Sequence, residues 1–359
     1  MMTSHQMILF TDLLMSGKPR TRLIIMLVIG ALLMLTSLLV FFTTGTRFVY
    51  VHLMYLPVVL GAMTFGIPGG LLFGLLAGLC IGPFMPLDTL TGEMQSVSGW
   101  VFRTVFFMLT GSVVGTFSAL FKQRIRSAQG LAFKLAETYE QNLRTFVGLV
   151  ESRDNETVGH CERVAYNAFQ LGQKMGLKSE ELDELYWAGL MHDLGKISVP
   201  EVILKKPGKL NDMEYALMRR HTIYGHDILQ AVSPFFANIA VGVRAHHEKY
   251  DGSGYPDGLK GEDIPLYGRI LAVVDVFEAL TSHRTYRTPL AQQEAIQYLQ
   301  EHTGSHFDPQ LVPAFIQLIE KGEVMMADQE APARTRRVPR GLVRRMERNQ
   351  SGPQAGSLP

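Results

Sequence analysis

A long stretch without charge constrains this chain more than any other feature. Residues 23–43 read LIIMLVIGALLMLTSLLVFFT and contain no charged side chain. A helix of about 20 apolar residues crosses roughly 30 Å of hydrocarbon, so the run predicts a transmembrane helix. A cleaved signal peptide is the alternative, but further apolar runs follow and no small-residue cleavage site is evident. The chain is therefore expected to contain a membrane part.

Three more apolar runs follow the first one. They cover residues 48–66, 69–85 and 101–121, and charged residues are almost absent until position 121. A very short turn joins the second run to the third, so these two are either separate spans or a re-entrant pair. We expect about four transmembrane helices within residues 23–121.

The basic residues predict the orientation of these spans, because Lys and Arg concentrate on the cytoplasmic side. Three basic residues precede the first run and three follow the last: Lys18, Arg20, Arg22, Lys122, Arg124 and Arg126. The loop 86–99 holds two acids and no base, and Arg47 is a lone exception. Both ends, including residues 1–22, are therefore expected in the cytoplasm.

Charge and cysteine content narrow the polar half of the chain. The net charge is only +1, which gives no global basic field of the kind that binds a nucleic acid polymer. The two cysteines, Cys80 and Cys161, lie in unrelated surroundings, so no disulfide framework is expected. A reduced, cytosolic environment fits the polar half.

Residues 122–150 predict a helical linker that leaves the membrane. Its 3/4 spacing is carried by Ala128, Leu131, Leu135, Thr138, Asn142, Thr145 and Leu149. The spacing fits a short parallel coiled coil, and thus a homodimer, with Asn142 fixing the register. A connector helix that packs on its own domain fits equally well.

Residues 151–325 are expected to be helical, because no alternating strand pattern appears. Asn211 followed by Glu214 indicates a helix start with a capping acid. Thr288-Pro289 and Asp308-Pro309 each indicate a cap followed by a first-turn proline. Residues 326–359 are rich in Pro, Gly and Arg and predict a disordered tail, with contact to anionic lipid as the alternative.

Imidazoles and carboxylates recur in the helical half. They are Glu156, His160, His192, Asp193, His221, His246, His247 and Asp275. Glu156 and His160 are four residues apart and share a helix face, and Asp275 interrupts an apolar helix, where a carboxylate is costly unless paired. Each residue alone is more often a hydrogen-bonded core residue or a cap. Together, as oxygen and nitrogen ligands without thiolate, they predict two or three divalent metal ions, with Fe or Mn preferred over structural zinc.

These motifs resemble the HD-GYP family, a branch of the HD-domain metal phosphohydrolases. The resemblance rests on HDLGK at 192–196 and HHEKYDGSGYP at 246–256, and it extends over roughly residues 146–319. ESRDNETVGHCERVA, KISVPEVILKKPGKL and DVFEALTSHRTYR occur in the expected order. The resemblance implies an all-α, helical HD-type bundle in residues 151–325 that hydrolyses cyclic di-GMP to pGpG or GMP.

The resemblance also implies roles for individual residues. Seven positions match the family's metal ligands: His160, His192, Asp193, His221, His246, His247 and Asp275. Glu156 matches an acid found in members with a third metal, and Asp193 would bridge two ions. Lys196 matches a lysine on the scissile phosphate, while Gly254, Tyr255, Arg284 and Arg287 match substrate-binding positions. His283 departs from the family pattern, which usually has Asp there, and this puts fine substrate positioning in doubt.

The whole chain is thus expected to be a multi-pass protein of a bacterial inner membrane, in contact with membrane lipid, with a cytoplasmic phosphodiesterase under the control of the membrane region. Three alternatives stay open at this point. The first is that the helical half is a non-catalytic cyclic dinucleotide receptor. The second is that it hydrolyses a different cyclic dinucleotide, and the third is that the membrane part is a transporter. The third is weakened because the spans hold almost no ionisable groups apart from His52 and Arg103.

Overall fold

A computed structural model describes residues 19–43, 45–47, 49–153, 159–283, 288–326 and 329. The chain divides into two compact units, Met1–Ala132 and Phe133–Pro359, and each is described by itself. Three of the predicted site residues, Glu156, Arg284 and Arg287, lie outside the described residues, as do the segment before residue 19 and nearly all of the predicted tail.

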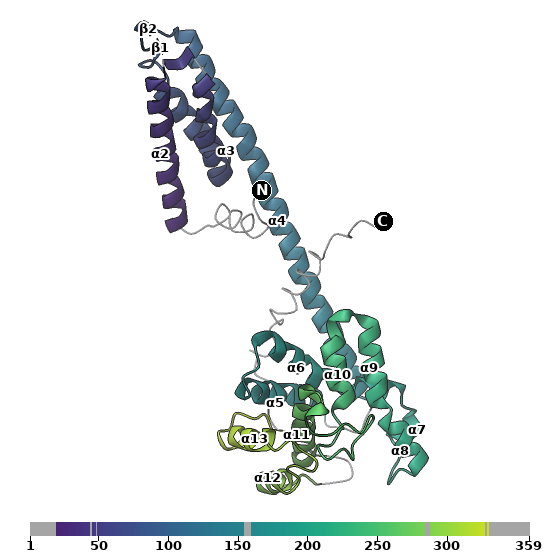
Figure 1. The fold of residues 1–359 in the computed structure, drawn as a ribbon. Coiled ribbons are helices and arrows are strands. Elements are labelled where there is room, and N and C mark those ends of the chain that lie inside the picture. The colour runs from purple at the N-terminus through teal and green to yellow at the C-terminus, as the bar shows by residue number, and fades with distance from the viewer. Residues whose placement is uncertain are drawn as a thin grey trace, which may run out of the picture. The chain divides into compact units, whose positions relative to one another are not determined.

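The first unit consists of apolar helices and a small pair of β-strands (Figure 1). Its elements are α2 (Pro19–Phe42), η1 (Gly45–Arg47), η2 (Val49–Met54), α3 (Tyr55–Cys80), β1 (Pro86–Asp88), β2 (Glu93–Met94) and the first part of α4 (Val97–Glu151). The two strands pair in antiparallel fashion. Three helical segments, Pro19–Phe42, Val49–Cys80 and Val97–Glu151, are long and apolar enough to cross a membrane.

Helix α3 is interrupted at Gly66, whose φ of 72° and ψ of −152° are not helical. A Cβ atom on Gly61 would lie 2.1 Å from the ring of Phe73, twelve residues further on. Such a contact is not available within a straight helix, so the chain reverses at Gly66 and its two arms pack together. The arms correspond to the second and third apolar runs. The four runs thus lie in three helical segments, and a count of four spans stays a prediction.

Small residues let α3 and α4 approach closely in the first unit. A Cβ on Gly70 would lie 2.1 Å from the carbonyl oxygen of Gly111, and one on Gly74 would lie 2.7 Å from the Cα of Met108. Close backbone packing of this kind is how helices associate where no water drives them together.

Helix α4 begins in the first unit and ends in the second, and it contains both the fourth apolar run and the predicted linker. Near its end, Val147 and Val150 are buried in the core of the second unit. The seven residues with 3/4 spacing, from Ala128 to Leu149, are all exposed. The last part of α4 therefore packs on its own domain with one face and leaves the predicted seam uncovered.

The second unit is a helical bundle, which confirms the all-α prediction. Its elements after α4 are α5 (His160–Lys174), α6 (Ser179–Met191), η3 (Leu194–Ser198), α7 (Glu201–Leu204), α8 (Asp212–Arg219), α9 (His221–Val232), η4 (Pro234–Phe236), α10 (Ala237–Ala245), η5 (Gly261–Asp263), α11 (Leu266–Thr281), α12 (Gln292–Glu301) and α13 (Leu311–Glu320).

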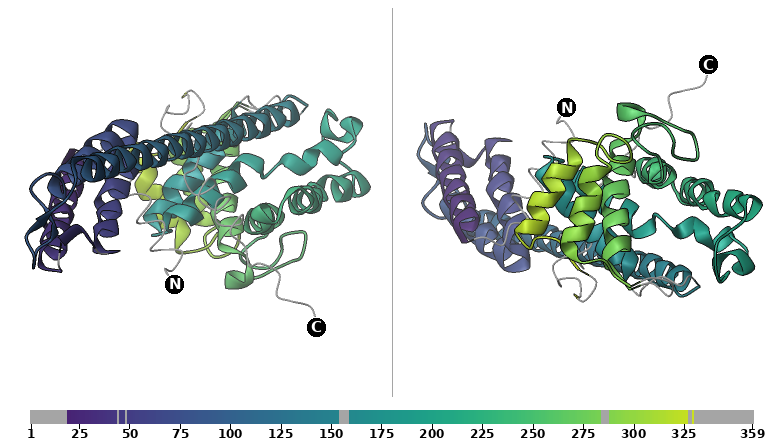
Figure 2. Two further views of the ribbon diagram at one scale, coloured as in Figure 1. Left: turned by 90° about the horizontal axis from the view of Figure 1, so that it is seen from above. Right: turned by 90° about the horizontal axis from the view of Figure 1, so that it is seen from below.

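The core of this bundle forms where α11 crosses its neighbours. Trp187 of α6, Phe277 of α11 and Phe315 of α13 are fully buried in one cluster. Helices α11, α12 and α13 lie side by side in the view from below (Figure 2). On the other side α5 packs on α6 at Gly189, where a Cβ would lie 2.7 Å from the Cα of Ala165. This packing brings the start of α5 and the end of α6 together.

Two of the three predicted helix starts are confirmed. The side chain of Asn211 accepts a hydrogen bond from the Glu214 amide at 2.9 Å, and the Glu214 carboxylate accepts from the Asn211 amide at 2.8 Å. Asp308 also caps a helix as predicted: its Oδ1 accepts a hydrogen bond from the Gln310 amide at 2.7 Å, and its carbonyl oxygen accepts from the Val312 amide at 3.4 Å, at the start of α13. The third start was placed too early, because α12 begins at Gln292 rather than after Thr288.

Candidate metal centre

Three imidazoles of the site lie immediately after a helix end. His192 follows α6, His246 follows α10, and His221 comes just after α8. Each Nδ1 contacts the main-chain carbonyl oxygen three residues earlier. These carbonyls belong to Gly189, Met218 and Val243, at 2.8, 2.8 and 2.6 Å respectively. A carbonyl can only accept, so each Nδ1 carries the proton and each Nε2 lone pair is free to point inward.

His160, the first residue of α5, is oriented by a carboxylate. Its Nδ1 contacts the carboxylate of Glu278, which lies on α11 and is buried. Arg163 Nε donates to the same carboxylate at 2.8 Å, and Ser282 Oγ donates at 2.7 Å. Burial opposes ionisation of Glu278, but His160 and Arg163 outweigh it and lower its pKa to about 2. The imidazole is thus fixed with Nε2 toward the site, as an outer carboxylate fixes a metal-bound histidine.

The inward nitrogens face one another at short range. Nε2 of His160 lies 3.3 Å from Nε2 of His192, and Nε2 of His221 lies 3.4 Å from Nε2 of His246. Two unprotonated nitrogens repel at this distance unless a cation lies between them. Ligands about 2.1 Å from one ion are themselves roughly 3–3.4 Å apart, so the spacing fits a shared cation. The donor set of this site therefore fits metal ions.

The Asp193 carboxylate serves two groups of imidazoles. Its Oδ2 lies 3.0 Å from His192 Nε2, and its Oδ1 lies 3.4 Å from His221 Nε2. Oδ2 also lies 2.9 Å from Nζ of Lys196, one turn further on. A carboxylate with one oxygen toward each group has the geometry of a bridge between two cations.

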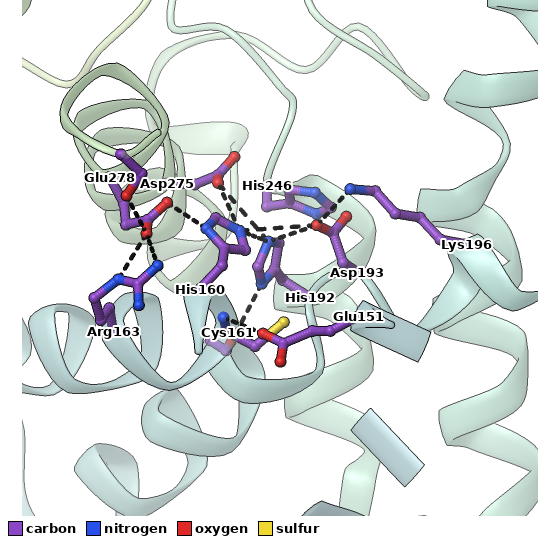
Figure 3. A network of polar contacts seen from close by, with 12 residues as sticks. Glu151, His160, Cys161, Arg163, His192, Asp193, Lys196, His246, Asp275 and Glu278 are labelled. Carbon is purple, nitrogen blue, oxygen red and sulfur yellow. Dashed lines mark hydrogen bonds and ion pairs between the residues drawn. The ribbon is translucent and has the colours of Figure 1, made fainter. Parts of the chain in front are cut away.

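Seven of the predicted metal ligands lie close together here, and Figure 3 labels His160, His192, Asp193, His246 and Asp275 among them. Asp275 Oδ1 lies 3.4 Å from His160 Nε2. Three groups have ligand atoms within 4.8 Å of one another: His160, His192 and Asp275; His221, His246 and His247; and His192, Asp193 and His246. The third group joins the other two, which is the arrangement that a cluster of two ions needs.

Gly195 in the HDLGK motif permits this convergence. A Cβ atom there would lie 1.9 Å from the main-chain oxygen of His221. Any larger residue would push η3 away from α9. The glycine therefore allows Asp193 and Lys196 to approach the imidazole that opens α9.

Burial and charge also prepare the groups for cation binding. Burial lowers the pKa values of His246 and His247 well below 6.5 and favours the neutral form that binds metals. Burial works against ionisation of Asp193 too, but His192 and Lys196 hold its pKa well below the ordinary value. At His192 burial is outweighed by Asp193, which raises the imidazole pKa, so a proton competes there with a cation.

The loop after the histidine pair lies directly against it. The buried carboxylate of Glu248 accepts hydrogen bonds from the backbone amides of Asp257, Gly258 and Leu259. Residue 254 has to be glycine for the loop to pack this closely, because a Cβ atom there would lie 2.2 Å from the backbone nitrogen of Lys249.

Tyr255 lies between the histidine pair and an arginine. Its amide donates to the His247 carbonyl at 3.2 Å, and the two rings are 4.9 Å apart. The Arg219 guanidinium lies 4.8 Å from the centre of the Tyr255 ring. The loop thus forms one wall beside the candidate metal centre.

Several contributing residues were not predicted from the sequence. Glu278 and Arg163 orient His160, Glu248 holds the loop, and Arg219 packs on Tyr255. A signal for Glu278 was present, because it interrupts the same apolar helix as Asp275 and a buried carboxylate there needs partners. The other three carried no comparable signal, because an acid or arginine in a polar segment is usually a solvated side chain.

The fold and site define a helical HD domain, and the sequence comparisons agree. Residues 144–311 match the family described as HD domain. This part of the chain is similar to the HD-domain family, and its HHEKYDGSGYP loop resembles that of the HD-GYP branch.

Three relatives are each 40% identical to this chain. The 3'3'-cGAMP-specific phosphodiesterase 2 of Vibrio cholerae matches over 52% of this chain and 36% of its own length. The cyclic di-GMP phosphodiesterase response regulator RpfG of Xanthomonas campestris matches over 54% and 53%. The cyclic di-GMP phosphodiesterase of Thermotoga maritima matches over 47% and 46%. The chain spans from about a third to about half the length of these relatives.

Proposed function

We propose that the protein is a metal-dependent phosphodiesterase that hydrolyses a cyclic dinucleotide, with cyclic di-GMP as its substrate and pGpG or GMP as its product. The observation that carries this proposal is the convergence of seven imidazole and carboxylate side chains, with Asp193 oxygens toward His192 and His221. Relatives named as cyclic dinucleotide phosphodiesterases support the substrate class.

The ligands would hold two divalent ions, with Fe or Mn as the expected metals, and Glu156 is the proposed ligand of a third. His160, His192 and Asp275 would hold one ion, and the second would be held by His221, His246 and His247. Asp193 would bridge the pair. Ions at these positions would act as Lewis acids and lower the pKa of a bound water.

The chain's own groups then have separate tasks. The four Nδ1-anchored imidazoles keep their Nε2 atoms aimed inward without reorganisation. Lys196, whose Nζ already lies beside Asp193, would donate to a non-bridging oxygen of the scissile phosphate and stabilise the charge that develops there. Gly254, Tyr255, Arg284 and Arg287 are proposed to hold the rest of the substrate. The water would attack phosphorus in line with the departing 3′ oxygen, which opens the ring.

A second substrate has specific support. A relative specific for 3'3'-cGAMP is as similar to this chain as those named for cyclic di-GMP. The two dinucleotides differ in one base, and the proposed metal centre would act on the phosphodiester that both share. A purely binding role is less well supported, because such a receptor would have no need for Lys196 beside Asp193.

Membrane attachment completes the proposal. The apolar helices would anchor the chain in the lipid of a bacterial inner membrane, with the second unit in the cytoplasm and under the control of the first. The exposed seam on α4, which includes Leu135 and Leu149 at 64% and 60% exposure, would pair with a second copy as a parallel coiled coil.

The decisive test is a hydrolysis assay of the full chain in detergent with Mn²⁺, using cyclic di-GMP and 3'3'-cGAMP side by side. We expect a linear product from cyclic di-GMP, and we expect Asp193→Ala to abolish it because one ligand and the bridge are lost together. Faster turnover of 3'3'-cGAMP would favour the second substrate. Wild-type turnover by Asp193→Ala would overturn the assignment of the site.

A further inference from the structure

The end of α4 contacts the backbone beside two groups of the metal centre. Oε1 of Glu151, the last residue of α4, accepts a hydrogen bond from the Cys161 amide at 2.7 Å (Figure 3). Cys161 directly follows His160. Two residues after the helix end, Nη1 of Arg153 donates to the carbonyl of Ile197 at 2.9 Å, and Ile197 directly follows Lys196.

The Glu151 contact replaces a missing helix cap. The first amides of a helix have no partner within the helix, and a side chain at the cap position usually supplies one. The cap position of α5 is Gly159, with φ of 82° and no side chain to offer. A carboxylate from α4 fills this role, and its charge also suits the positive end of the helix dipole. The first turn of α5, which begins with His160, is therefore held by another helix.

A second contact joins α4 to the same turn. Nη1 of Arg144 lies 2.7 Å from Oε2 of Glu162, and the Tyr186 hydroxyl contacts the other oxygen of that carboxylate. Arg144 also lies 3.0 Å from Glu140 of its own helix. Two contacts thus join α4 to the start of α5: Glu151 with the amide of Cys161, and Arg144 with the carboxylate of Glu162.

A cavity lies between α4 and the centre. Val147, Val150 and Glu151 line it from α4, and Asp193 and Lys196 line it from the site. The cavity is small, and Leu190 and Leu194, which flank His192 and Asp193, complete its lining, so apolar packing also joins α4 to this region. Glu151 and Arg153 add direct polar contacts from the end of α4 to backbone atoms beside the centre.

We propose that the end of α4 positions the metal centre, with Glu151 acting on His160 through the first turn of α5 and Arg153 acting on Lys196 through η3. Both are positioning residues, because neither touches a proposed ligand atom. Since α4 is continuous from Val97, a displacement along this helix would change metal affinity through Glu151 and turnover through Arg153. The part concerning turnover rests on the proposed function, whereas the part concerning metal affinity does not.

The first test measures Mn²⁺ affinity of the metal-stripped full chain in detergent by calorimetry. Glu151→Ala should weaken binding about 10-fold or more, the loss typical for removal of an outer partner of a metal ligand. Glu151→Gln keeps an acceptor oxygen and should lose less. Glu137→Ala is the matched control, because Glu137 is an exposed acid on the same helix. Saturating Mn²⁺ should restore turnover to Glu151→Ala if positioning is its role.

Equal Mn²⁺ affinity in Glu151→Ala, Glu137→Ala and the wild type would overturn the role of Glu151. Should the alanine variant fail to fold, the glutamine variant decides. A measurable Mn²⁺ affinity that is weaker than that of the wild type supports the proposal. A Mn²⁺ affinity equal to that of the wild type contradicts it. If the wild type binds Mn²⁺ but cleaves neither dinucleotide, the proposed function fails while this comparison still stands.

Arg153 has a different expected signature. Arg153→Ala should lower kcat about 10-fold with Mn²⁺ affinity unchanged, because Lys196 is not a metal ligand. A parallel loss of Mn²⁺ affinity in this variant, or an unchanged kcat, would contradict its separate action on Lys196.

Discussion

At the scale of single residues, the Glu278 carboxylate is the acceptor for Nδ1 of His160. Main-chain carbonyls are the Nδ1 acceptors for His192, His221 and His246. The Glu278 carboxylate accepts from His160, Arg163 and Ser282, so the buried charge is fully partnered. A charge buried without partners costs several kcal/mol, whereas a partnered one is tolerated and orients its neighbours. Glu278 therefore links the stability of the bundle to the geometry of the site.

Glu278→Gln should lower the stability of the folded chain at neutral pH by about 3–5 kcal/mol, because it breaks a buried pair. The pKa of Glu278 falls from 4.5 to about 2 on folding, so its contribution is present above pH 4.5 and is lost as the pH falls toward 2. Thermal unfolding of the full chain between pH 6 and 2 should show a flatter pH dependence in the variant. An unchanged slope, matching that of Glu137→Gln, would contradict this role.

Sequence reasoning predicted ligands better than their supports. Histidines and an aspartate within an apolar helix are rare enough to stand out, and their order along the chain matched a known pattern. Arg163 and Glu248 looked like ordinary surface residues, because Arg163 is buried against Glu278, 115 residues further on, and Glu248 against a loop whose path the sequence does not show. Which nitrogen of each imidazole faces inward also depends on such partners, so only the structure could supply it.

At the scale of the elements, close backbone contacts determine how the ligands meet. The approach of η3 to α9 depends on Gly195, and that of α6 to α5 depends on Gly189. The helix start at Asn211 was predictable because both capping partners are local. The start of α12 was not, because Glu294 caps the Ala291 amide at 2.9 Å and moves the start past Pro289.

Gly195→Ala should weaken Mn²⁺ binding at least tenfold and lower the melting temperature, because its Cβ would overlap the His221 carbonyl. Gly148→Ala is the matched control: a Cβ there meets nothing within 4 Å, and alanine favours a helix by about 1 kcal/mol. Calorimetry and thermal unfolding of the two variants check this. Wild-type Mn²⁺ affinity in Gly195→Ala would show that the close approach is not needed.

At the scale of the whole molecule, α4 connects the predictions about membrane, dimer and site. The linker's 3/4 pattern left open whether its apolar face packs on its own domain or on a second copy. The structure separates two faces: Val147 and Val150 are buried in the bundle, while Leu135 and Leu149 are exposed. A periodic pattern cannot by itself reveal that one helix carries two apolar faces, one buried in the bundle and one exposed.

The full chain in detergent should be a dimer, and Leu135→Glu with Leu149→Glu should convert it to a monomer, because like charges would face each other across the seam. Gln129→Glu, at an exposed position of α4 that faces away from the seam, should leave the dimer intact. Mass measurement over a range of concentrations checks this. A wild type that stays monomeric throughout would contradict the pairing.

The metal content of the purified full chain tests the central claim most directly. After loading with Mn²⁺ and removal of excess, elemental analysis should find at least two ions per chain in the wild type. In Asp193→Ala, which lacks the carboxylate between the two imidazole groups, the content should fall to one or none. A wild-type chain that retains no transition metal, or an Asp193→Ala chain that retains as much as the wild type, would contradict the account.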